Sequence, residues 1–118
     1  MKKKDFEKLI IDTLAELPGF FIRKMKNVDV VIENEPTPKQ VKTHRQSVLG
    51  LYQGVPLSER THLYGLVLPD KITIFKRNIE RVCKTDEEIK KLVSDTVKHE
   101  LAHHFGISDE RLTDLGVY

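Results

Sequence analysis

The chain has 118 residues, of which 39% are hydrophobic and 32% are charged. This length fits one globular domain, and the composition is too apolar for a disordered chain and too polar for a membrane protein. Twenty basic residues against eighteen acidic ones leave a net charge of +2, which does not favour a nucleic-acid partner. We therefore expect a single domain over residues 1–118 and no membrane span.

The cysteine content and the N-terminal segment bear on the cellular compartment. Cys83 is the only cysteine, so no internal disulfide can form and no paired-cysteine zinc or redox motif is present. The basic run at residues 2–4 is followed by Asp5 and Glu7, which interrupt the apolar region that a signal peptide needs. We expect a cytoplasmic protein, with Cys83 as a small buried hydrophobe.

The first half of the chain predicts one helix and two strands. Apolar residues recur every three or four positions over residues 5–17, which predicts an amphipathic helix. The β-branched run at residues 28–32 predicts a strand, and residues 33–47, with two prolines and no clear period, predict a long loop. Residues 48–52 have strand composition.

The second half predicts a strand and a long helix. A turn-rich connection at residues 54–60 leads to an apolar segment at 63–68, and residues 78–84 carry no clear pattern. Alternation over residues 71–75 predicts a half-solvated strand, which is either an ordinary sheet strand or one that pairs with an extended peptide. The Thr85 and Glu88 spacing of a capping box and the stop at Gly106 predict a helix over residues 86–105.

Polar side chains on the apolar side of this last helix are the informative anomaly. A rotation of about 100° per residue places Val93 and Val97 on the apolar face and Ala102 on the opposite face. The same arithmetic puts four polar residues on the apolar side, namely His99, Glu100, His103 and His104. Burying such groups without partners is costly, so this end of the helix should line a cleft or hold a metal.

The spacing of the histidines favours a metal. His99 and His103 are four residues apart on one helix face, so both imidazoles can reach one ion at about 2 Å. Glu100 then lies beside the ion and can take a proton from metal-bound water and pass it to a leaving amine. This is the His-Glu-x-x-His pattern of zinc peptidases.

A catalytic zinc usually has three protein ligands, so a third is expected after the helix, where the residues with metal-binding side chains are Asp109, Glu110 and Asp114. Gly106 would let the chain turn back in a left-handed conformation and carry Asp109 to the ion. Asp109 could instead cap a last short helix, in which case Asp114 is the reserve ligand.

The segment from His99 to Asp109 resembles the extended metzincin signature, with aspartate in place of the third histidine. It is closer still to the minimal zincins, a family of very short bacterial metallopeptidases, which residues 50–60 and 68–75 also resemble. The resemblance implies zinc ligands at His99, His103 and Asp109, with Glu100 as the base. The chain departs from true metzincins because its only methionines, Met1 and Met25, precede the motif, so it has no Met-turn.

Several neighbouring residues keep more than one interpretation. For His104, local packing or a favourable interaction with the helix dipole is favoured over metal binding. Tyr52, Arg60 and Tyr64 either stabilise an oxyanion or serve packing and surface contacts.

We therefore expect an α+β, zincin-like minimal domain, with a small mixed sheet packed on an N-terminal helix and on the His-Glu-x-x-His helix. One Zn²⁺ per chain and a peptide or protein substrate are expected, and the reaction is hydrolysis of a peptide bond. One alternative is zinc-dependent hydrolysis of another bond, such as that of RNA, suggested by basic residues of the 33–47 segment: Lys39, Lys42, His44 and Arg45. The other alternative is a non-catalytic peptide- or protein-binding module stabilised by zinc.

Overall fold

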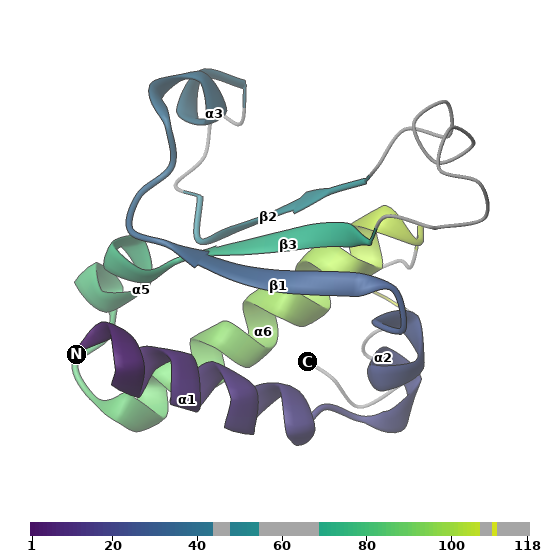
Figure 1. Cartoon of the computed structure of the whole chain (residues 1–118), viewed down its shortest axis with the longest axis horizontal. Coiled ribbons are helices and arrows are strands. Elements are labelled where there is room, and N and C mark those ends of the chain that lie inside the picture. Colours follow the sequence, from purple (N-terminus) through teal and green to yellow (C-terminus); the bar gives the residue numbers. More distant parts are fainter. Residues whose placement is uncertain (44–47, 55–68, 107–109, 111–118) are drawn as a thin grey trace.

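A computed structural model describes residues 1–43, 48–54, 69–106 and 110 of the chain. A three-stranded sheet lies on a layer of helices formed by α1, α2 and α6 (Figure 1). The predicted α+β class and the small mixed sheet are therefore confirmed.

Two helices open the chain where the sequence predicted one. Helix α1 (Lys3–Ala15) turns Phe6, Ile10 and Thr13 into the core, as the apolar spacing predicted. It ends two residues before the predicted end, and Pro18 then precedes a short second helix, α2 (Gly19–Lys24). Phe21 of α2 is fully buried, so this unpredicted helix also covers the core.

The sheet is mixed, in the order β1-β3-β2. Strand β1 (Val28–Glu33) runs parallel to β3 (Asp70–Phe75), and β2 (Gly50–Gln53) runs antiparallel to it. All three strands were predicted to within two residues at each end.

The predicted strand at residues 71–75 is confirmed as an ordinary sheet strand, but it is not half-solvated, and the alternative of pairing with an extended peptide is wrong. Both edges of β3 already bond to strands, β1 on one side and β2 on the other. Its residues are also buried, apart from the half-buried Lys71. Ile72 and Ile74 join the main core, whereas Phe75 packs with Val48 and Leu51 in a small second cluster.

Two more short helices lie where no helix was predicted. Helix α3 (Pro38–Thr43) falls inside the predicted loop at residues 33–47. Thr37 and Gln40 begin it with a reciprocal pair of hydrogen bonds, from the Thr37 amide to Gln40 Oε1 at 2.8 Å and from the Gln40 amide to Thr37 Oγ1 at 3.2 Å. Helix α5 (Lys76–Val82) occupies most of the unassigned segment.

The long C-terminal helix α6 (Asp86–His104) follows the prediction closely. The Thr85 hydroxyl accepts a hydrogen bond from the Glu88 amide at 3.1 Å, and the Glu88 carboxylate accepts one from the Lys84 amide at 2.7 Å. These bonds satisfy amides that a helix start would otherwise leave unpaired. Within the described part of the chain, no helix is long and apolar enough to span a bilayer.

The buried face of α6 widens towards its C-terminal end. Val93, Val97 and Leu101 are fully buried, as the spacing predicted. Ala102 was expected on the polar face but is fully buried too, in the same core cluster as Phe21. Helix α2 packs against α6 as well, and its Phe21 belongs to this cluster.

Candidate metal centre

The two histidines of the motif lie side by side on the last two turns of α6. The ring centroids of His99 and His103 are 4.8 Å apart and the ring planes are tilted by 59°. Both side chains are exposed, whereas the sequence analysis placed them on the apolar side of the helix. The helical period explains this, because they lie about 120° and 80° around the axis from Val93, at the margin of the buried face.

Exposure at this margin leaves both imidazoles accessible to an ion. Neutral imidazole is a common ligand of zinc, with a bond of about 2.0–2.1 Å, and rings one helical turn apart can both point a nitrogen at one ion. Within the described residues, no group of three or more histidine, cysteine, aspartate or glutamate side chains could hold a metal. Asp109 and Asp114 lie outside the described residues, so the third ligand stays a prediction.

Glu100 occupies a different position on the helix from its histidine neighbours. It is half-buried and lies between the exposed His99 and the fully buried Leu101. It lies about 20° around the axis from Val93, near the centre of the buried face, so its carboxylate is partly shielded from water. A carboxylate that lies beside two candidate metal ligands and is partly shielded from water is suited to moving a proton.

Helix α6 ends as its sequence predicted. Phe105 is the C-terminal cap, and Gly106 follows with a φ of +67°, in the left-handed region. A Cβ on Gly106 would have no atom within 4 Å, so the need for glycine is conformational and not a matter of space. The chain thus leaves α6 by the turn that was expected to lead towards Asp109.

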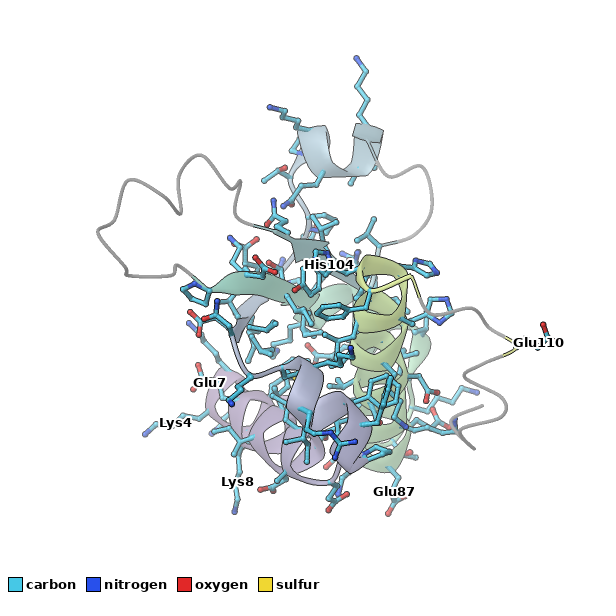
Figure 2. All side chains as sticks on the ribbon, turned by 90° about the vertical axis from the view of Figure 1, so that its right-hand side faces the viewer. Lys4, Glu7, Lys8, Glu87, His104 and Glu110 are labelled. Carbon is cyan, nitrogen blue, oxygen red and sulfur yellow. The ribbon has the colours of Figure 1, made fainter. Side chains whose placement is uncertain are left out.

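The other flank of the last turn contacts the sheet through His104. Its imidazole stacks on the ring of Tyr52 in β2, with centroids 3.9 Å apart and planes within 19°. The Tyr52 hydroxyl donates a 2.7 Å hydrogen bond to Oδ2 of Asp70 in β3, and His104 Nε2 lies 3.6 Å from the same oxygen. Figure 2 shows His104 between α6 and the sheet.

This contact decides some of the interpretations that the sequence left open. Local packing, the favoured interpretation of His104, is confirmed. Tyr52 has a packing role, and its hydroxyl bonds to a carboxylate; Arg60 and Tyr64 lie outside the described residues. Asp70 could not be found from the sequence, because no local pattern indicates that a carboxylate at the start of one strand will meet a tyrosine 18 positions earlier.

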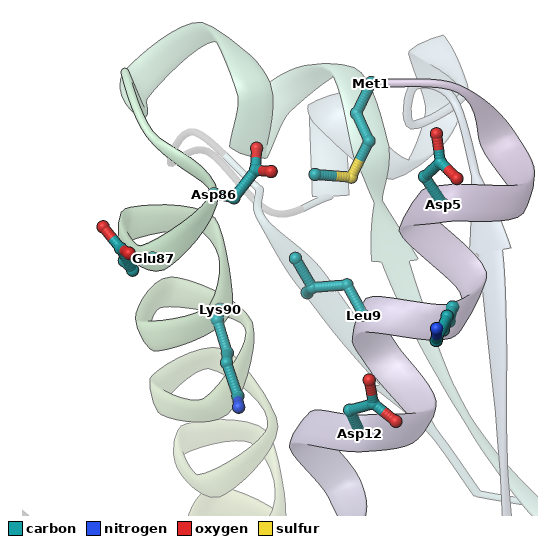
Figure 3. Close-up of a pocket in the computed structure, with 8 residues that line it drawn as sticks. Met1, Asp5, Leu9, Asp12, Asp86, Glu87 and Lys90 are labelled. Carbon is teal, nitrogen blue, oxygen red and sulfur yellow. The ribbon is translucent and has the colours of Figure 1, made fainter.

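A surface hollow of about 400 Å³ lies at the opposite end of α6, between its first turns and α1 (Figure 3). Carboxylates line it from both helices: Asp5 and Asp12 on α1, with Asp86 and Glu87 on α6. It contains no histidine or cysteine and is remote from the His99 and His103 pair along the helix. The structure therefore does not connect this hollow with the expected metal chemistry.

Comparisons with known proteins agree with the fold and show the family. A family model described as "Zincin-like metallopeptidase" matches residues 25–117. Among solved structures, the chain is similar to a conserved hypothetical protein, TTHA0227, from "Thermo thermophilus", at 25% sequence identity and a TM-score of 0.55. That match covers 89% of this chain and 94% of the other. No curated protein matches the chain.

Proposed function

The chain belongs to the zincin-like metallopeptidase family, and from this premise we propose that it is a zinc-dependent peptidase whose site lies at the end of α6. The observation that carries the proposal is the pair of exposed imidazoles of His99 and His103, one helical turn apart. Glu100, which lies between them in the sequence, is half-buried. Two ligands and a base on one helix match the chemistry that the family description names.

In this proposal His99, His103 and Asp109 hold one zinc ion per chain. Zinc, when bound, supplies a Lewis acid that polarises a carbonyl and lowers the pKa of a water to about 7. Glu100 would be the residue that takes a proton from the attacking water and passes it to the leaving amine. Its partial burial limits competition from solvent for that proton.

The peptide substrate in this proposal is extended and adds to the edge of the sheet. Strand β3 cannot pair with a peptide because both its edges already pair with strands. Among the described residues, β2 pairs only with β3. Strand β2 also packs against α6, which carries the histidines. Backbone hydrogen bonds to such an edge hold a peptide without demanding particular side chains.

Metal content and turnover, measured together, test the proposal. Elemental analysis of protein purified without added metal should give about one zinc per chain, and His99→Ala and Asp109→Ala should lose it. Glu100→Gln should keep the zinc and lose cleavage of a labelled peptide library by at least about 100-fold. Glu87→Gln is the matched control, because the same change at the exposed start of α6 should alter neither quantity.

Each contrary result has a defined meaning. A native protein that takes up no zinc contradicts the proposal as a whole. If zinc is lost in His99→Ala but kept in Asp109→Ala, the third ligand is Asp114 and not Asp109. Full activity in Glu100→Gln removes its role as base. If the protein cleaves structured RNA but not peptides, and a chelator stops the cleavage, the alternative of RNA hydrolysis is favoured. If the protein binds zinc but yields no product from any substrate, a non-catalytic binding module is favoured.

A further inference from the structure

Three polar side chains from three elements meet at the last turn of α6. His104 comes from α6, Tyr52 from β2 and Asp70 from β3. Tyr52 links the other two, because its ring stacks on the imidazole at 3.9 Å and its hydroxyl donates to the carboxylate at 2.7 Å. We name these three residues the anchor cluster.

The anchor cluster is a strong local contact. Asp70 is only 8% exposed, and a hydrogen bond to a buried carboxylate is stronger than one between neutral groups in water. The end of β2 lies against it, since a methyl group on Gly54 would be 3.5 Å from Cε1 of His104 and 3.7 Å from Oδ1 of Asp70. Stacked rings add a contact beyond the area that they bury.

The last turn of a helix is where such a contact matters most. Backbone carbonyls there have no partner within the helix, so helix ends fray. The final backbone bonds of α6 are those from the Phe105 amide to Leu101 at 3.0 Å and from the Gly106 amide to His103 at 3.3 Å. If this turn opens, His103 moves relative to His99, which lies one turn deeper in the helix.

We propose that Tyr52, Asp70 and His104 are positioning residues, which fasten the last turn of α6 to the sheet and hold His103 beside His99. The consequence for metal binding rests on the proposed function, whereas the fastening of the turn does not. His103 and His104 are both exposed, but the His104 ring stacks on Tyr52 of the sheet, whereas the His103 ring lies beside that of His99. The cluster therefore restrains the ligand without touching the ion.

The test compares variants of the full chain by amide hydrogen exchange, before and after treatment with a chelator. Tyr52→Leu removes both the stacking and the hydrogen bond, and Tyr52→Phe removes only the bond. Phe75→Leu is the control, because it loosens the separate cluster with Val48 and Leu51. In Tyr52→Leu, the amides of residues 103–105 should exchange about three- to tenfold faster relative to those of Val93 and Val97, and Tyr52→Phe should be intermediate.

Binding of cobalt, a spectroscopic substitute for zinc, tests the second half of the proposal. Tyr52→Leu should bind cobalt about tenfold more weakly and with an altered visible spectrum, Tyr52→Phe should recover much of the loss, and Phe75→Leu should resemble native protein. The anchor is overturned if amide exchange at residues 103–105 is unchanged in Tyr52→Leu. It is also overturned if exchange there is no faster in Tyr52→Leu than in the control Phe75→Leu. Faster exchange with unaltered cobalt binding overturns the positioning role. A native protein that binds no metal contradicts the proposed function, while the exchange data still decide the anchor.

Discussion

Gly50 in β2 lies so close to α6 that a single added methyl group should disturb their packing. A Cβ at this position would be 2.6 Å from Cγ2 of Thr96 in α6 and 3.2 Å from the backbone oxygen of Thr73 in β3. The Thr96 methyl cannot rotate away freely, because its hydroxyl donates a 2.6 Å hydrogen bond to the Leu92 carbonyl. The clash must therefore be relieved by a shift of the helix or the strand.

The expected cost of Gly50→Ala is that of overpacking a buried contact, about 1–3 kcal/mol in the free energy of unfolding. The free energy of unfolding falls by about 1–3 kcal/mol per molar of urea, so the urea concentration at the unfolding midpoint should fall by about 1 M. Circular dichroism during urea titration measures this shift. Because α6 carries the candidate metal ligands His99 and His103, zinc content should be measured on the same samples.

A second substitution identifies the clash as the cause. Thr96→Ser removes the methyl that the new Cβ would meet and keeps the hydroxyl that bonds to Leu92. Alone it should cost less than about 1 kcal/mol, the value of one buried methyl group. Combined with Gly50→Ala it should recover at least about 0.5 kcal/mol relative to the sum of the two single changes. Additive costs, or no cost for Gly50→Ala, would refute the reasoning.

Two further predictions concern the ends of helices. Thr85→Ala should lower the free energy of unfolding by about 1 kcal/mol, because the Glu88 amide loses its acceptor, and Thr85→Ser should stay near native in the same urea titration. Hydrogen bonds from Lys76 and from the N-terminal amine lower the pKa of Glu80 below 4.5. This carboxylate therefore stabilises the fold above pH 4.5, and the contribution is lost as the pH falls through its lowered pKa. Glu80→Gln should be less stable than native at pH 7 but not in acid, and a deficit that persists in acid would contradict this origin.

Local signals account for the elements that the sequence predicted and for one that was overlooked. The spacing of apolar residues and the Thr85 cap fixed α6 almost to the residue. Helix α3 carries the same kind of signal, since Thr37 and Gln40 have capping-box spacing and Pro38 occupies the first helical position. Two prolines in one segment are typical of a loop, but proline is also favoured at a helix start.

By itself the sequence determined the α+β class, the strand positions and the helix that carries His99, Glu100 and His103, because hydrophobic period and capping act between residues close in the chain. The tertiary structure alone decided that β3 lies between two strands, that Ala102 is buried in the same core cluster as Phe21 of α2, and that His104 meets Tyr52 and Asp70. Such outcomes depend on which elements pack together, and no local pattern in the chain encodes contacts between residues that lie far apart along it.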